Sequence, residues 1–317
     1  MCEKDMKIFV WRFCRFILPC VAFCLAITLS AFFAYRCLYL SKIKIPEGVK
    51  YVVVGDSQAA CAVSPRQFPA LMNVAAPGLS LLQTYYKITD ILKVNGNRDF
   101  TIVLDISPSR LDMPLKPLSL EDFSSRYAFL NLLHCFDPYD KGVNKPFLMV
   151  RAKIIRDGLK LVFREWFPSR KRKAKSDKTP WGGFLPMDEA MYVTDPDAAV
   201  SMVDECARSI MLQHAIKTGS QENLKLLSRI VETVQASQKE IIIVTTPWHK
   251  SLVKVLPKDY LADFLKQMSE FSVNSGVVWH NDLEFICDDN YYADQNHLNR
   301  TGAEIYTRSL FGRITKE

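Results

Sequence analysis

The sequence predicts an α/β fold, a three-layer sandwich in which helices cover both faces of a mainly parallel sheet. Two observations predict it. Short, continuous runs of β-branched and other apolar residues alternate along the chain with segments of ten or more residues that have helical periodicity. Continuous apolar runs are typical of strands buried on both faces, as in parallel sheets. Helical connections of this length join parallel strands.

Four segments are predicted to form strands. The first, residues 51–54, is Tyr-Val-Val-Val, and the second, residues 101–106, is Thr-Ile-Val-Leu-Asp-Ile. The third, residues 240–245, is Glu-Ile-Ile-Ile-Val-Thr, and the fourth, residues 277–279, is a short Val-Val-Trp. The second and third runs are followed by Ser-Pro and Thr-Pro, which are turn signals.

Helical spacing of apolar residues predicts seven helices. They are residues 64–72, 79–94, 147–167, 197–217, 221–237, 260–275 and 301–311. The last helix is expected to begin with a cap from Asn299 or Thr301. Residues 111–196 interrupt the alternation of strands and helices, so we interpret them as an insertion beside the functional edge of the sheet.

An apolar segment near the N-terminus predicts a membrane anchor. Residues 16–35 are twenty consecutive residues without a charged side chain, and such a helix spans roughly 30 Å of hydrocarbon. A cleaved signal peptide is the alternative, but its apolar core would be shorter and no small-x-small cleavage site follows cleanly. We therefore predict a tail and anchor in residues 1–44, the tail being cytoplasmic in the orientation that the resemblance named below implies, and a folded domain in residues 45–317. Basic residues flank the span almost equally, which leaves its orientation open.

Charge and cysteine content indicate which binding partners and cofactors to expect. Residues 151–178 hold eleven basic and three acidic side chains, so they carry the whole positive balance of a chain whose net charge is +7. This basic segment is either a patch for a membrane surface or an anionic polymer, or a solvated helix face and loop. A nucleic-acid partner is not expected, because no binding module is recognisable.

The nine cysteines form no CxxC pair, so neither a metal site nor a cofactor is predicted.

Two short motifs supply the parts of an acyl-transfer site. Gly55-Asp56-Ser57 directly follows the first predicted strand, and Asp294 lies three residues before His297. Ser57 would be the nucleophile, His297 its general base, and Asp294 the carboxylate that orients the base. Each motif alone is weak, since the first also fits an ordinary strand-ending turn and the second a helix-capping histidine with a surface aspartate. No metal is needed for this chemistry.

Ser57, Ser107 and His249 all come within four residues after the end of a predicted strand. The carboxyl ends of parallel strands meet at one edge of the sheet, where ligands bind, so we expect these side chains on the same edge. His249 is a candidate for contact with substrate, although a surface histidine beside Trp248 is an equally good interpretation.

These motifs resemble those of the SGNH/GDSL hydrolase superfamily. Gly55-Asp56-Ser57 resembles its first block, Gly78 its second-block glycine, and the Asp294 to His297 segment its last block. With an N-terminal anchor, a strand ending in Ser-Pro and a Pro-x-His after a late strand, the chain is similar to membrane-bound SGNH-like proteins of bacterial surface-polymer acylation. The alginate O-acetylation proteins and the teichoic-acid D-alanyl transfer protein are of this kind.

The resemblance implies a serine acyltransferase. The backbone amides of Ser57 and Gly78, helped by Ser107, would bind the oxyanion. An acyl ester would be the donor and a hydroxyl of a surface polysaccharide the acceptor, with an integral membrane protein as a further partner. The anchor, residues 16–35, would cross a bacterial inner membrane once and leave the domain facing the periplasm or outside. One departure is that the superfamily's third block, Gly-x-Asn-Asp, is replaced here by Asp105-Ile-Ser-Pro, which lacks the usual Asn donor.

Two other functions fit the same sequence. An esterase would use the same three residues with water as the acyl acceptor. A non-catalytic envelope scaffold would use the basic segment, residues 151–178, as its contact surface.

Overall fold

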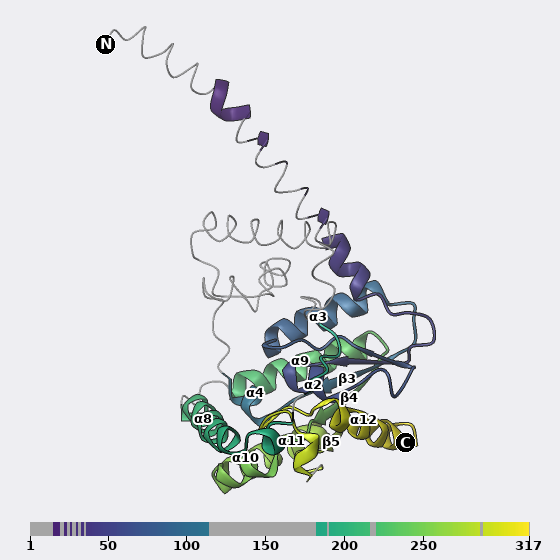
Figure 1. The fold of residues 1–317 in the computed structure, drawn as a ribbon. Helices are drawn as coiled ribbons and strands as arrows, with labels where there is room; N and C mark the ends of the chain where they lie inside the picture. Colours follow the sequence, from purple (N-terminus) through teal and green to yellow (C-terminus); the bar gives the residue numbers. More distant parts are fainter. Residues whose placement is uncertain are drawn as a thin grey trace, which may run out of the picture.

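The structure is a computed structural model that describes residues 36–113, 182–188, 190–215, 220–285 and 288–316, and scattered residues between 15 and 34 (Figure 1). The predicted helix at 147–167, the basic segment and most of the predicted insertion lie outside the described residues.

Within the described residues, five parallel strands form one sheet in the order β2-β1-β3-β4-β5. The strands are β1 (Tyr51–Val54), β2 (Leu71–Asn73), β3 (Thr101–Asp105), β4 (Glu240–Thr245) and β5 (Val278–Asn281). The α/β fold class is confirmed, and all four predicted strands are present. From β1 the chain continues to β2 on one side of it, and then crosses over to β3 on the other side, followed by β4 and β5. The carboxyl ends of β1 and β3 therefore border the crevice in which sheets of this order bind ligands.

One predicted element is wrong: residues 64–72 do not form a helix. Leu71–Asn73 is instead the edge strand β2, which pairs in parallel with Tyr51–Val53. Pro69 disfavours helical backbone at the residue before it, and the chain reaches β2 through turns. A strand of three residues is too short for sequence periodicity to reveal it.

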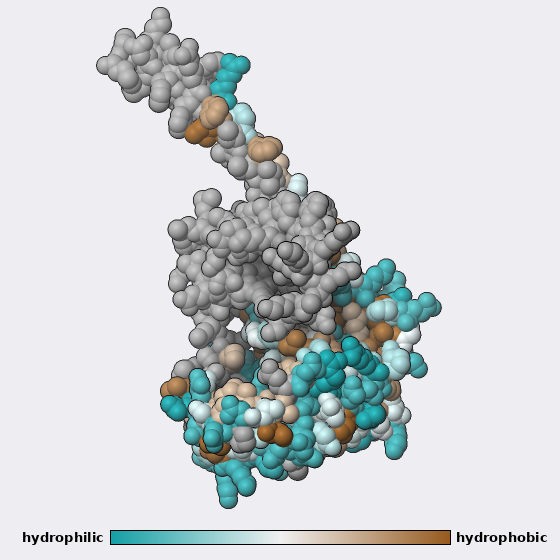
Figure 2. All heavy atoms as spheres, in the orientation of Figure 1, coloured by the Kyte–Doolittle hydropathy of each residue, from teal (hydrophilic) through white to brown (hydrophobic). Residues whose placement is uncertain are grey.

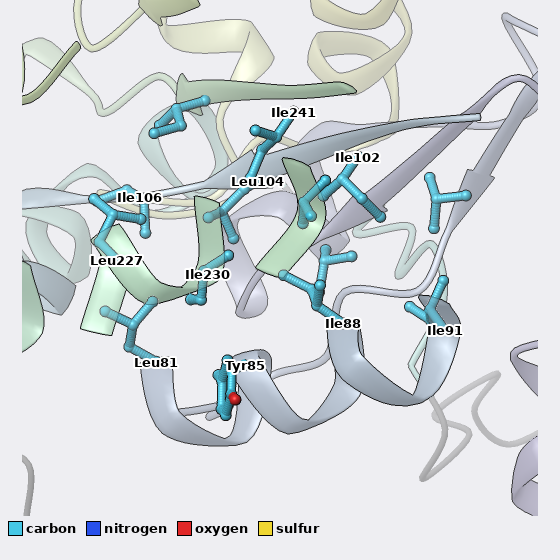
Figure 3. Packing of buried hydrophobic residues seen from close by; sticks show 14 of the residues in the cluster. Leu81, Tyr85, Ile88, Ile91, Ile102, Leu104, Ile106, Leu227, Ile230 and Ile241 are labelled. Carbon is cyan, nitrogen blue, oxygen red and sulfur yellow. The ribbon is translucent and has the colours of Figure 1, made fainter. Parts of the chain in front are cut away.

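Helices cover both faces of the sheet. On one face lie α3 (Leu81–Val94), α9 (Ser220–Ala236) and α11 (Lys258–Ser275), and Figure 3 shows apolar side chains of α3 and α9 meeting those of the strands. On the other face, α2 (Ser57–Ala62) and α12 (Arg300–Ile314) pack against alternate strand residues. Residues on both faces of β1, β3 and β4 are thus buried, which explains why these strands are continuously apolar.

In the part of the chain that the structure describes, four more helices and one 3₁₀ turn contact one another and the helices that cover the sheet. They are α4 (Pro108–Asp112), α7 (Met191–Thr194), α8 (Pro196–Ala215), α10 (Lys250–Val255) and the 3₁₀ turn η3 (Asp289–Tyr291). Helices α8 and α10 lie side by side (Figure 1). They share an apolar cluster with α11, built from Ile210, Trp248, Leu252, Leu256, Tyr260 and Leu283.

The packed domain begins before residue 45. Residues 36–42 are helical, and Tyr39, Ile43 and Ile45 are buried in the same core as α3. The Asn95 side chain accepts a hydrogen bond from the Ile45 N–H at 2.8 Å and donates one to the Ile43 carbonyl at 3.0 Å. The junction is therefore fixed to the end of α3.

Half of the predicted anchor, residues 16–35, lies outside the described residues. Figure 2 shows hydrophobic atoms along this N-terminal extension, and the described side chains of Phe16, Phe23 and Phe33 are exposed. None of the helices in the described part of the chain has the length and apolar character needed to cross a membrane.

Candidate active site

Ser57 is the first residue of a helix that starts directly after the buried strand β1. Asp56 is the N-cap of α2, and its carboxylate accepts a hydrogen bond from the Gln58 N–H at 2.8 Å. Gly55 is required at the turn because a Cβ there would lie 2.8 Å from the Cβ atoms of both Ala59 and Asp105. The short turn thus places the Ser57 hydroxyl at the carboxyl edge of the sheet.

The helix that carries Ser57 has only six residues, and neighbouring elements hold its C-terminal carbonyls. The Asn73 side chain donates to the Ala59 carbonyl, and the Leu185 N–H donates to the Ala60 carbonyl at 2.8 Å. Thr307 of α12 donates to the Ala62 carbonyl. A helix this short is not stable alone, so these contacts account for its position.

The turn from Asp294 to His297 is fixed by its own backbone. Tyr292 and Leu298 form an antiparallel bridge, and the Ala293 N–H donates to the His297 carbonyl at 2.9 Å. The Asp294 carboxylate accepts hydrogen bonds from the N–H groups of Asn296 and His297. The carboxylate therefore has one orientation before any substrate binds.

The fold brings the two distant motifs together. His297 Nε2 lies 2.8 Å from Ser57 Oγ, and His297 Nδ1 lies 2.8 Å from an oxygen of Asp294. The side chains of His297 and Asp294 are 19% and 14% exposed. With Nδ1–H donated to the carboxylate, Nε2 is free to accept the serine proton. This is the arrangement that acyl-transfer chemistry requires of a nucleophile, a base and an orienting acid.

The electrostatics favour a charged His297 next to a charged Asp294. Burial alone would lower the pKa of His297, but the hydrogen bond and charge of Asp294, together with the charge of Asp56, raise it above its ordinary value. Burial alone would raise the pKa of Asp294, but the hydrogen bond and charge of His297 and two backbone N–H groups lower it. The pair therefore stabilises the imidazolium that forms when Ser57 gives up its proton.

Gly78 and Ser107 both lie beyond the carboxyl ends of strands. Gly78 is exposed and has a φ of +77°, which favours glycine, and the Ala76 N–H donates to the Gly55 carbonyl at 3.0 Å. The loop after β2 is thus fastened beside the turn that carries Ser57. Ser107 is fully buried as the N-cap of α4, with its oxygen 3.3 Å from that of Ser109. A role for either in binding an oxyanion stays a prediction.

His249 is hydrogen-bonded to the 294–297 turn. Its side chain is 3% exposed, Nδ1 accepts a hydrogen bond from the Ser251 N–H, and Nε2 lies 3.1 Å from Asp289. Its backbone N–H donates to the Gln295 carbonyl at 3.0 Å. The structure thus shows His249 supporting the turn, while contact with substrate stays a prediction.

Sequence reasoning missed Tyr192 and Asp105. The Tyr192 ring stacks on His249 at 3.5 Å, and its hydroxyl lies 2.9 Å from that of Ser251, but no motif marks it. Asp105 is fully buried against Gly55, and burial and the charge of Asp56 raise its pKa to about 7. The one sequence signal for Asp105 was a carboxyl group inside an apolar strand.

The chain matches no protein-family model and no curated protein. Among the described residues, no group of three or more His, Cys, Asp or Glu could hold a metal ion.

Proposed function

We propose that this protein is an SGNH-like serine acyltransferase that moves an acyl group of the acetyl type from an ester donor to hydroxyl groups of a cell-surface polysaccharide. The observation that carries the proposal is the Ser57–His297–Asp294 hydrogen-bonded set at the carboxyl edge of a parallel sheet. The motif resemblance supports the substrate class.

The reaction would proceed through an acyl-enzyme. Ser57 Oγ attacks the carbonyl carbon of the donor ester as its proton passes to His297 Nε2, and Asp294 stabilises the imidazolium. The negative oxygen of the tetrahedral intermediate is bound by the backbone N–H groups of Ser57 and Gly78. The intermediate collapses, and the leaving alcohol takes the proton from His297. An acceptor hydroxyl then repeats these steps in reverse, and the new ester leaves.

The predicted setting belongs to the same proposal. Residues 16–35 anchor the protein once in a bacterial inner membrane, and the domain faces the periplasm. An integral membrane protein that supplies acyl groups would be its partner. The fixed junction at residues 36–45 would hold the domain next to such a partner.

The test is activity-based labelling of the full chain in detergent with a fluorophosphonate serine probe, followed by peptide mapping. We expect the label on Ser57, and we expect His297→Ala to remove it because the hydroxyl then lacks its base. Folded wild-type protein that takes no label would contradict an activated serine and favour the scaffold hypothesis.

A hydrolytic function with the same site is favoured by one observation. His297 remains partly exposed, so water can reach the base. Acyl-enzyme formed from an activated acetyl ester should distinguish the two functions. A transferase should release acyl groups faster when oligosaccharide acceptors are added, whereas an esterase should release acetate at a rate that the acceptors do not change.

A further inference from the structure

A strap, defined as residues 182–188, makes main-chain hydrogen bonds to three elements around the candidate site. The Gly183 N–H donates to the Ala75 carbonyl at 2.9 Å, in the loop that leads to Gly78. The Leu185 N–H donates to the Ala60 carbonyl in α2, and the Arg300 N–H of α12 donates to the Met187 carbonyl at 2.7 Å. One short segment thus connects the predicted oxyanion loop, the nucleophile helix and the helix that follows His297.

Two of these bonds involve backbone groups at the ends of helices. Ala60 is in the last turn of α2, and Arg300 is the first residue of α12, so neither group has a partner within its own helix. Phe184 and Leu185 of the strap also pack against the apolar cluster shared by α2 and α12. The strap therefore fixes the position of these elements relative to one another.

Gly182 is the tightest point of the strap. Its φ is +89°, and a Cβ there would lie 2.3 Å from the Val74 carbonyl oxygen, 2.6 Å from that of Ala75 and 2.9 Å from Lys87 Nζ. Real Cβ contacts are essentially never this short, and backbone carbonyls cannot rotate away. Lys87 is itself buried and donates to the Val74 carbonyl. A side chain at Gly182 must therefore push the strap and the 74–78 loop apart.

We propose that Gly182 is a positioning residue that holds the 74–78 loop at the distance from Ser57 at which the Gly78 amide can bind an oxyanion. This rests on the proposed function, since only a reaction with an oxyanion needs that distance. Gly182 acts through the loop and does not touch the reacting atoms.

Gly183 offers a matched control one residue away. Its φ is +135°, so alanine is strained there too, but its Cβ would meet only the Asn73 carbonyl oxygen at 3.9 Å. Comparing Gly182→Ala with Gly183→Ala separates collision from backbone strain. Gly312→Ala, in the α12 helix where a Cβ meets nothing within 4 Å, controls for substitution itself.

The experiment measures the rate constant for fluorophosphonate labelling of Ser57 in the full chain, per folded molecule, with the folded fraction taken from circular dichroism. We expect Gly182→Ala to slow labelling by about 10²-fold, the usual effect of losing one oxyanion donor. Gly183→Ala should slow it less than about tenfold, and Gly312→Ala not at all. The midpoint of the acid limb of the pH profile should not move in Gly182→Ala, because the Ser57–His297 pair is untouched.

Equal rates for the two alanine variants, or loss of labelling only in proportion to loss of folded protein, would overturn the positioning role. If Gly182→Ala does not fold, Phe184→Ala loosens the strap without a collision. It should then slow labelling of the folded fraction, and an unchanged rate would contradict the proposal. Failure of the wild-type chain to label at Ser57 would instead refute the proposed function.

Discussion

Among the described residues, one cluster of serine, histidine and aspartate includes the 294–297 turn and a second is hydrogen-bonded to that turn through the His249 N–H. The two clusters differ in which ring nitrogen faces the serine. In the candidate site, His297 Nε2 faces Ser57 and Nδ1 faces Asp294. In the second cluster, His249 Nδ1 lies 2.6 Å from the oxygen of Ser251, two residues away, and Nε2 faces Asp289.

The difference shows that the same three residue types can be arranged in two distinct ways. His249 Nδ1 also accepts the Ser251 N–H and so caps α10, which makes its serine part of a helix start. Burial lowers the pKa of His249 despite the nearby Asp289, whereas Asp294 and Asp56 raise the pKa of His297. The arrangement around His249 thus favours the neutral ring that caps a helix, and the arrangement around His297 favours taking up a proton.

The largest effect should separate the two serines. Ser57→Ala should reduce turnover of an activated acetyl ester by about 10⁵-fold or to background, because the nucleophile is gone. Ser251→Ala should change turnover less than about threefold. Steady-state rates of the two purified variants provide the measurement, and a comparable loss in both would mean that the second cluster also takes part in the reaction.

The second largest effect should distinguish the two aspartates, Asp294 and Asp289. Asp294→Asn should lower turnover by about 10⁴-fold, since the ring loses its orienting charge. The acid limb of the labelling profile should also move to lower pH, because the pKa of His297 loses its main raising partner. Asp289→Asn is the control and should leave both quantities unchanged. An acid limb that stays in place in Asp294→Asn would mean that another group controls labelling.

The third comparison concerns stability. His249→Ala should lower the free energy of unfolding by about 2–4 kcal/mol, because it removes a helix cap and a buried ring stacked on Tyr192. Ser251→Ala should cost about 0.5–1.5 kcal/mol, the usual net value of a hydrogen bond. Urea denaturation of the full chain in detergent would measure both. If His249→Ala unfolds like the wild type, the structural role assigned to this cluster is wrong.

The smallest predicted effect is on the pH dependence of stability, to which the two histidines contribute with opposite signs. A histidine with a lowered native pKa destabilises the fold as pH falls through its unfolded value of about 6.5, because the unfolded chain binds the proton first. A histidine with a raised native pKa stabilises the fold below that value, and this contribution is lost as pH rises through the native pKa.

His249→Gln and His297→Gln should therefore change the pH slope of stability in opposite directions. Relative to each variant, the wild type should lose stability on acidification because of His249 and gain it because of His297. Unfolding free energies measured between about pH 5 and pH 8 would test this. Slopes of the same sign would contradict the assigned electrostatics.

Strands β1, β3, β4 and β5 and the three catalytic candidates were predictable because each carries a local signal. Apolar runs mark the strands, and Gly-Asp-Ser and Asp-x-x-His mark the chemistry. The edge strand β2 was missed because three residues carry no periodicity. The strap was also out of reach, since its hydrogen bonds are made by backbone groups whose partners lie far along the chain.

The buried junction determines where the domain can be fused to a different N-terminal sequence. Tyr39 and Ile43 belong to the core, and Asn95 pairs with backbone groups of residues 43 and 45. A fusion joined after residue 44 would remove two core side chains and leave Asn95 without one of its acceptors. A fusion joined near residue 36 would keep them, so the portable unit is longer than the folded domain that the sequence predicted.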